Sequence, residues 1–191
     1  MVNKKTLIVV LVEPSGPINV GSVARLCKNF SVHELRLVSP KCDYLNQEAK
    51  RMAVRGVNIL EKATVFKDLN SALSDCSRII ATCGRTEHGD IPLNSNKDAL
   101  CWALKSKREE KIALVFGRED RGLSNEELLK ANKVISLNTS GDYPSLNLSH
   151  AVAIILHELS QFNEIGLSKH HKTISDPANL IKLEDCIDDA G

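Results

Sequence analysis

Short apolar runs rich in β-branched residues alternate with stretches of helical spacing through most of this chain. The first run, residues 6–12 (TLIVVLV), is typical of a strand buried on both faces. Strands that alternate with helices favour a parallel sheet with helices on both faces, an α/β domain. Further strands are predicted at residues 35–38, 64–66, 78–82, 112–116 and 134–137.

Helical spacing fills the intervals between these runs. We expect one domain over residues 1–163, followed by a short acidic tail, 164–191, that holds at most one amphipathic helix at 177–187. The domain's helices are predicted at residues 18–30, 44–54 and 68–74, from a cap at Asn96 to about residue 107, after a capping box of Ser124 and Glu127, and at 148–162.

Composition excludes several classes of protein. Six cysteines lie scattered without a C-x-x-C pair, so neither a zinc site nor a disulfide framework is expected, and a reducing cytoplasm fits best. The apolar run at residues 6–12 is too short for a signal peptide or a membrane span. We therefore expect a cytoplasmic protein that needs no metal and no membrane.

Charge is distributed unevenly along the chain. Residues 1–60 hold nine Lys and Arg against four Asp and Glu, whereas residues 164–191 hold three against six. A basic front permits a polyanionic partner. Charge alone is equally compatible with an ordinary solvated surface.

In open parallel sheets, ligands bind beyond the carboxyl ends of the strands, so the loops there are the candidate sites. After the first strand, Gly21 and Ser22 precede Arg25 by about one helical turn, which predicts a bare helical face where Arg25 meets a phosphate. An exposed surface arginine is the alternative. The loops 82–90 and 116–123 carry glycines among charged residues, but neither a G-x-G-x-x-G motif nor a P-loop is present.

The stretch 141–155 joins a polar loop to an apolar helix. Pro144 excludes helix before it, and Ser145, Asn147 and Ser149 occupy the first turn. Free N–H groups at such a helix start suit a small polar ligand, although simple capping by Asn147 or Ser145 would explain the same pattern.

Three of these segments, taken in order, resemble the motifs of the SPOUT RNA 2′-O-ribose methyltransferases of the TrmH type. They are N-x-G-x-x-x-R from Asn19 to Arg25, F-G-x-E-x-x-G-L from residue 116 to 123, and S-L-N-L-S-x-A-V from residue 145 to 152. Within this family the chain is most similar to the TrmJ branch, which methylates the ribose at tRNA position 32, on the evidence of Glu13, Pro14, Arg85 and Tyr143.

The resemblance implies a deep trefoil knot at the C-terminal end of the sheet, closed by the helix 148–162. It also implies a homodimer whose active site is completed across the interface, with S-adenosyl-L-methionine bound in the knot. The cofactor-binding residues would be Thr82, Cys83, Gly84, Gly117, Arg118, Glu119, Ile135, Leu137, Ser145, Leu146, Asn147 and Leu148.

The same resemblance assigns catalytic roles. Arg25 would orient the ribose hydroxyl and its phosphate, because a guanidinium is a reluctant base. Asn19 would fix Arg25 or the phosphate, and Glu119 would orient Arg25 or the site loops. Ser145, Asn147 and Tyr143 would shape the cofactor and ribose contacts. RNA, tRNA above all, would be bound by Arg25, Lys28 and Arg85.

TrmJ-type enzymes usually continue into a C-terminal helical extension, which residues 164–191 do not match. We therefore expect weak tRNA binding, or reliance on a basic N-terminal surface made of Lys28, Arg36, Lys50, Arg51 and Arg55. The alternatives are methylation of rRNA or of another tRNA ribose, and a SPOUT-like RNA-binding protein without catalysis.

Overall fold

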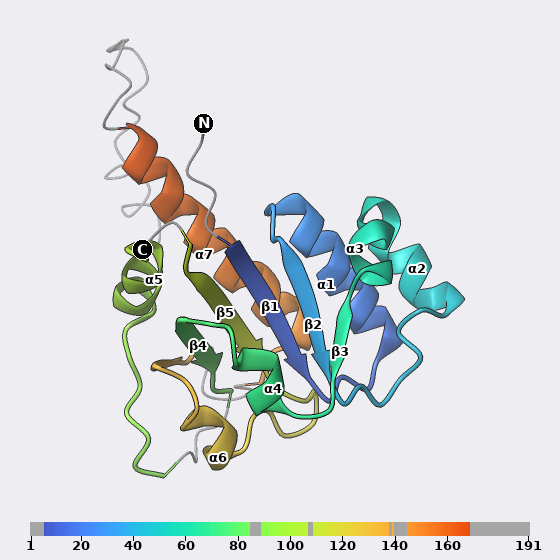
Figure 1. Cartoon of the computed structure of the whole chain (residues 1–191), viewed down its shortest axis with the longest axis horizontal. Helices are drawn as coiled ribbons and strands as arrows, with labels where there is room; N and C mark the ends of the chain where they lie inside the picture. The colour runs from blue at the N-terminus through green and yellow to red at the C-terminus, as the bar shows by residue number, and fades with distance from the viewer. Residues whose placement is uncertain (1–5, 85–88, 107–108, 138, 140–144, 169–191) are drawn as a thin grey trace, which may run out of the picture.

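The computed structural model describes residues 6–84, 89–106, 109–137, 139 and 145–168, the side chains of 163–168 excepted. In this part of the chain one sheet of parallel strands runs in the order β3-β2-β1-β5-β4-β6 (Figure 1). The strands are β1 (Thr6–Val12), β2 (Glu34–Val38), β3 (Thr64–Phe66), β4 (Arg78–Thr82), β5 (Lys111–Phe116) and β6 (Lys133–Ile135).

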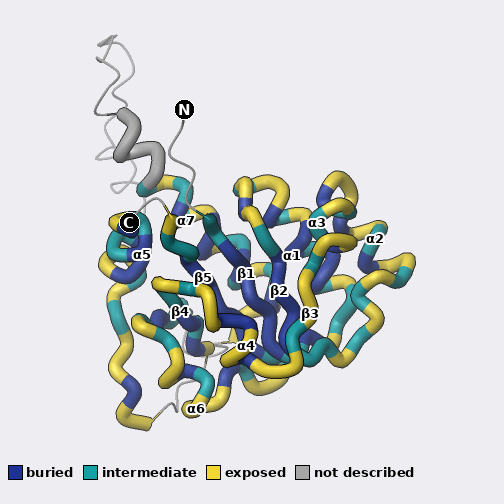
Figure 2. The backbone as a smooth tube through the Cα atoms, in the orientation of Figure 1, coloured by how far each residue is buried: buried dark blue, intermediate teal, exposed yellow. Residues whose placement is uncertain are grey.

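Side chains alternate between the two faces of the central strands, and both faces are buried. Val9 and Leu11 of β1 join a large core beneath α1 (Pro17–Asn29), α2 (Gln47–Ala53), α5 (Asn96–Leu104) and α7 (Leu148–Ser168). Ile8 and Val10 join a smaller core beneath α4 (Leu69–Leu73) and α6 (Asn125–Leu128). The predicted parallel α/β sheet with helices on both faces is confirmed, and Figure 2 shows its strands as the most buried part of the backbone.

The helices differ from prediction mainly at their ends. Asn46 caps α2 by accepting a hydrogen bond from the Ala49 N–H at 2.9 Å, and the predicted capping box of α6 is present. Asn96 is the first residue of α5 rather than its cap, since Ser95 precedes the helix. The helix predicted at 148–162 continues to Ser168, because no proline interrupts the chain there.

A short 3₁₀ helix, η1 (Val54–Gly56), and α3 (Val57–Glu61) follow α2. The sequence did not reveal them, because five residues are too few for a periodic signal. β6 ends at Ile135, two residues before the predicted end of this strand at residue 137. Leu137 lines a pocket instead of pairing in the sheet. The amphipathic helix predicted at 177–187 lies outside the described residues.

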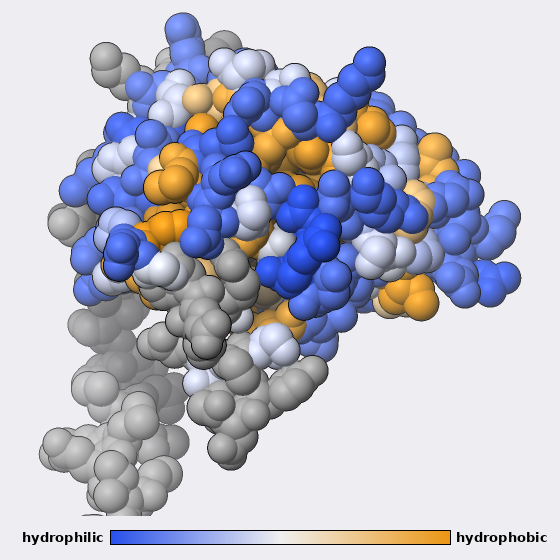
Figure 3. Space-filling model, turned by 90° about the horizontal axis from the view of Figure 1, so that it is seen from below, coloured by the Kyte–Doolittle hydropathy of each residue, from blue (hydrophilic) through white to orange (hydrophobic). Residues whose placement is uncertain are grey.

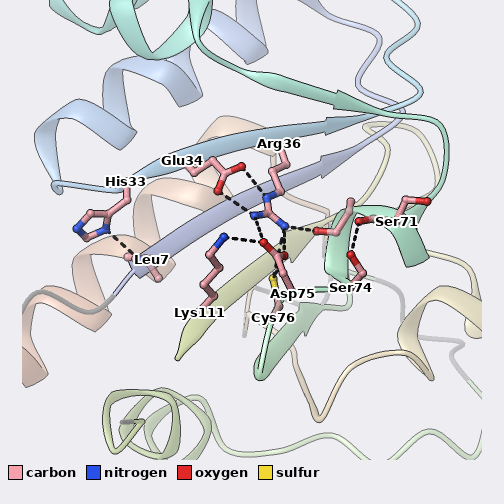
Figure 4. A network of polar contacts seen from close by, with 10 residues as sticks. Leu7, His33, Glu34, Arg36, Ser71, Ser74, Asp75, Cys76 and Lys111 are labelled. Carbon is pink, nitrogen blue, oxygen red and sulfur yellow. Dashed lines mark hydrogen bonds and ion pairs between the residues drawn. The ribbon is translucent and has the colours of Figure 1, made fainter. Parts of the chain in front are cut away.

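Arg36 of β2 is buried beneath α4 rather than on the basic surface where the sequence placed it. Its guanidinium donates to both oxygens of Glu34 at 2.9 Å and to Asp75 at 2.6 and 3.0 Å (Figure 4). Lys111 reaches Asp75 at 2.6 Å. The pKa of Asp75 is held well below its ordinary value by the hydrogen bond from Arg36, assisted by Lys111. Arg36 is therefore unavailable for RNA.

Replacing Asp75 with asparagine should lower the free energy of unfolding by about 2 kcal/mol at pH 7, since a charged hydrogen bond to buried Arg36 is lost. The stabilisation from ionised Asp75 is present above its unfolded pKa near 3.8 and is lost as the pH falls through the lower folded value. Urea unfolding followed by the fluorescence of Trp102 should therefore show the two stability curves converging in acid. A constant difference across this pH range would contradict the assignment.

Candidate active site

Loops from the carboxyl ends of β1, β4, β5 and β6 meet at one end of the molecule, the end seen in Figure 3. Hydrophilic and hydrophobic residues are mixed on this surface. Two features define the site: a polar junction between segments distant in sequence, and a pocket beside it.

Glu119, in the loop after β5, is the centre of the junction. Its carboxylate accepts hydrogen bonds from the backbone N–H groups of Ser15 and Gly16, both at 3.1 Å, and from the Asn19 side chain at 3.2 Å. Burial alone would raise the pKa of Glu119, but these N–H donors outweigh it and the pKa is lowered. Glu119 is thus an ionised anchor that fixes the start of α1.

Asn147 connects this anchor to α7. Its Nδ2 donates to Oδ1 of Asn19 at 3.0 Å, and its Oδ1 accepts from the N–H and hydroxyl groups of Ser149 at 2.9 and 2.8 Å. Asn147 therefore caps α7 and binds α1 at the same time. The chain Glu119–Asn19–Asn147 joins one residue from each of the three sequence motifs.

The pocket lies beside this junction, where the loops after β4 and β5 face the start of α7. Phe116, Gly122 and Ala151 also line it; they belong to the sequence motifs but were not among the predicted cofactor-binding residues. Ala151 could have been found from helical spacing, because it lies three residues after Leu148. Of the predicted cofactor-binding residues, the pocket is lined by Thr82, Cys83, Gly84, Gly117, Arg118, Glu119, Leu137, Leu146 and Leu148.

A glycine is required at position 117 by the close approach of the loop's two sides. A Cβ on Gly117 would lie 2.2 Å from the carbonyl carbon of Gly122. The backbones of Arg118 and Gly122 exchange hydrogen bonds at 3.3 and 3.0 Å, which closes a tight turn against the pocket. Gly122 has a φ of +67°, a value that favours glycine.

The Arg118 guanidinium holds this turn by donating to the Gly122 carbonyl at 3.3 Å. It donates to Glu13 at 2.7 Å and to both oxygens of Glu127 at 2.8 and 3.0 Å. The hydrogen bond from Arg118 is the main reason that the pKa of Glu13 is lowered. Arg118 thus ties the end of β1 to α6.

Replacing Arg118 with glutamine should lower the free energy of unfolding by about 1 to 3 kcal/mol, because two half-buried carboxylates lose a charged hydrogen-bond partner. Arg121 is a matched control, since its side chain is 69% exposed and lies 3.6 Å from Glu13. Arg121→Gln should change stability by less than about 0.5 kcal/mol. Equal losses in the two variants, measured by urea unfolding, would contradict the role given to Arg118.

Several predicted site residues lie elsewhere. Ile135 is buried in the core, where its carbonyl accepts from the Cys83 N–H at 2.8 Å, so it supports the β4 loop instead of lining the pocket. Ser145 and Asn147 are exposed beside the pocket and do not line it. Arg25 and Lys28 are exposed on α1. Arg85 and Tyr143 lie outside the described residues.

The bare helical face predicted around Gly21 is wrong. Gly21 is buried against α2, where a Cβ would lie 2.2 Å from the Ala49 carbonyl oxygen. The glycine therefore permits close packing of α1 on α2 and leaves no space for a phosphate.

Among the described residues, no group of three His, Cys, Asp or Glu side chains is placed to hold a metal ion. No helix in the described part of the chain is both long and apolar enough to cross a bilayer.

The fold is that of an α/β protein with a parallel sheet. Its pocket lies at the carboxyl ends of the strands, beside the start of α7, which is the usual place for a ligand site in such sheets. The model of the SpoU rRNA Methylase family matches residues 6–157. The chain belongs to this family. The family resemblance predicted from the three motifs is thereby confirmed.

Curated relatives support the same assignment. The tRNA (cytidine-2′-O-)-methyltransferase TrmJ of Methanocaldococcus jannaschii is 42% identical over 156 residues, which are 79% of this chain and 66% of the relative. The TrmJ of Sulfolobus acidocaldarius is 35% identical over 178 residues, 92% of this chain and 73% of the relative. The chain thus spans slightly less than two thirds of the first relative's length.

Among solved structures, a probable methylase family protein from Haemophilus influenzae Rd KW20 superposes with a TM-score of 0.78 at 35% identity, covering 88% of this chain and 71% of that one. TrmJ from Z. mobilis ZM4 gives a TM-score of 0.74 at 29% identity, covering 82% and 69%. The described fold is therefore that of known methylase-family structures.

Proposed function

We propose that this chain is an S-adenosyl-L-methionine-dependent RNA 2′-O-ribose methyltransferase that acts on tRNA in the cytoplasm, with the ribose at position 32 of the anticodon loop as its target. The observation that carries the proposal is the Glu119–Asn19–Asn147 chain beside the pocket, since it joins all three motifs. The substrate named for the TrmJ relatives, tRNA cytidine, supports the choice of RNA.

The pocket fits the methyl donor by the chemistry of its lining. Leu146, Leu148 and Phe116 offer apolar contacts, and the turn at Gly117 brings backbone groups close. Arg118 is the one cation among the described lining residues, and its guanidinium is committed to Glu13 and Glu127. Such a lining suits an adenine better than a polyphosphate. The bound cofactor would supply a methyl group activated by its sulfonium.

The polar junction would serve the ribose. Glu119 holds Asn19, and Asn19 holds Asn147, so the amide groups are fixed before substrate arrives. We assign Arg25 to the ribose hydroxyl and its phosphate, where a guanidinium stabilises alkoxide character without taking the proton. Ser145 and Tyr143 are proposed to complete the ribose contacts.

We also propose the trefoil knot and the homodimer. β6 is the edge strand beside β4, whereas α7, the next described element, packs against α1 and α5. This arrangement supports a knot, a rare topology.

Ile18, Leu146 and Ile154 are large apolar side chains left at least 36% exposed on or beside α1 and α7, which supports a second copy there. The proposed domain remains residues 1–163, although α7 continues past its boundary.

The proposal is tested by calorimetric titration of the purified protein with S-adenosyl-L-methionine and S-adenosylhomocysteine. Both should bind, and Gly117→Ala should abolish binding or prevent folding, whereas exposed Lys97→Ala should bind normally. Absence of binding to either compound by the folded wild-type protein would favour an RNA-binding protein without catalysis.

A further inference from the structure

Five exposed cations lie on α1 and on the helical segments α2, η1 and α3 that pack against it. Arg25 and Lys28 on α1, Arg51 and Arg55 on α2 and η1, and Lys62 at the end of α3 are all exposed. None of the five forms an ion pair or a side-chain hydrogen bond within the described residues. We call these five residues the basic ledge.

The acids on the same helices are few. Glu48 and Glu61 are the acidic residues of α1, α2, η1 and α3, and Glu61 lies 3.7 Å from Lys50, which is not part of the ledge. The ledge therefore carries local positive charge although the whole chain has a formal net charge of +1. A surface of this kind attracts a polyanion.

Close packing of the backbone brings the ledge together. A Cβ on Gly56 would lie 2.5 Å from the Ala24 carbonyl oxygen and 2.8 Å from the Arg25 nitrogen, so η1 rests directly on α1 beside Arg25. Figure 1 shows α2 and α3 alongside α1 at the β2–β3 end of the sheet. Arg55 is consequently a neighbour of Arg25.

The turn that places Arg55 is strained. Val54 has a φ of +49°, a conformation that a β-branched residue rarely adopts, and its side chain is 53% exposed. Such strain persists only where the surrounding structure enforces it, and it gathers at functional positions. Two residues later in the chain, Gly56 packs directly against the Ala24 carbonyl of α1.

The ledge continues into a hollow between α1 and α3. Lys28 and Lys62 both line it, together with the hydroxyl of Ser31 and the amide of Asn58. Glu34 also lines the hollow, and its carboxylate is paired with the buried Arg36 guanidinium at 2.9 Å. In the other direction α1 leads to Asn19, six residues before Arg25 and so about 9 Å along the helix axis. The cations thus extend from the polar junction to the hollow.

We propose that the basic ledge binds the phosphate backbone of the substrate RNA and directs it toward Arg25. This inference rests on the proposed function, because the ledge starts at the proposed catalytic arginine. It removes Arg36 from the basic surface predicted from sequence, adds Lys62 and the hollow, and gives this surface a role in binding the RNA backbone, independent of base sequence.

The test compares Arg55→Ala/Lys62→Ala with wild type in filter binding of unmodified tRNA transcript at several salt concentrations. Loss of two phosphate contacts should weaken binding about tenfold at 0.1 M salt and lower the slope of log K against log salt by about 2. In methyl transfer, KM for tRNA should rise, with kcat at saturating tRNA and the affinity for S-adenosyl-L-methionine unchanged. Thermal unfolding checks that the variant is folded.

The matched control is Lys97→Ala/Lys105→Ala, which removes two exposed cations from α5 and its end, beyond β4. This variant should bind tRNA like wild type. Unchanged binding by the ledge variant, or equal weakening in both variants, would overturn the inference, as would ledge-dependent binding to phosphatidylserine vesicles but not to tRNA. Failure of the proposed function itself would appear separately, as wild type that binds no S-adenosyl-L-methionine.

Discussion

Arg25→Ala should lower the rate of methyl transfer to RNA by about a thousandfold or more, while S-adenosyl-L-methionine still binds. The loss is that expected when one pre-placed donor to a developing oxyanion is removed. Cofactor binding should survive because Arg25 does not line the pocket. The free energy of unfolding should change by less than about 0.5 kcal/mol, since the Arg25 side chain is exposed and forms no ion pair or hydrogen bond among the residues that the structure describes.

Single-turnover transfer from labelled S-adenosyl-L-methionine, together with calorimetric titration of the cofactor, measures both effects. Arg25→Lys should recover a small part of the rate, because an ammonium group keeps the charge but not the planar fork. Lys97→Ala provides the control for loss of an exposed cation. Turnover at the wild-type rate in Arg25→Ala would remove Arg25 from the mechanism.

Glu119→Gln should reduce both turnover and cofactor affinity, because one residue anchors Ser15, Gly16 and Asn19. A glutamine offers one acceptor oxygen, and its NH₂ group would face backbone N–H donors that need an acceptor. We expect a rate loss of about a hundredfold and a loss of about 2 kcal/mol in the free energy of unfolding.

The pH dependence distinguishes this anchor from a simple packing residue. The folded pKa of Glu119 lies below its ordinary value of 4.5, so its stabilisation is present above that value and is lost as the pH falls through the folded pKa. In the Glu119→Gln variant, the free energy of unfolding should lack the part that falls with pH as Glu119 is protonated. Glu126→Gln, at an exposed position on α6, is the matched control and should follow wild type. If Glu119→Gln left both the rate of methyl transfer and the loss of stability at acid pH unchanged, the anchoring role would be contradicted.

The sheet was predictable from sequence because its strands are short runs of buried aliphatic residues. The register of β1 between β2 and β5 buries Val9 and Leu11 on one face and Ile8 and Val10 on the other, which explains why the first strand has no polar residue after Thr6. The junction was foreseen in part, since the motifs named Asn19, Glu119 and Asn147. Their hydrogen bonds depend on the tertiary structure, which no local pattern encodes.

Contacts between distant segments account for the errors. The sequence around Gly21 predicts an open helical face, but in the structure α2 packs against it. The sequence likewise predicts Arg36 to be a surface cation, but Glu34 and Asp75 pair with it. Ile135 supports the β4 loop through its backbone carbonyl, and a backbone hydrogen bond of this kind does not depend on the residue type, so the sequence could not predict it. In each case a neighbour remote in the chain decides the residue's role.

The most direct test of the proposed activity is transfer of labelled methyl groups from S-adenosyl-L-methionine to unmodified tRNA and to rRNA, followed by mapping of the modified nucleotide. We predict label on a ribose 2′-oxygen of tRNA, at position 32, and none with Arg25→Ala. Label on rRNA alone, on a base instead of a ribose, or on no RNA under conditions where the cofactor binds would contradict the proposed function.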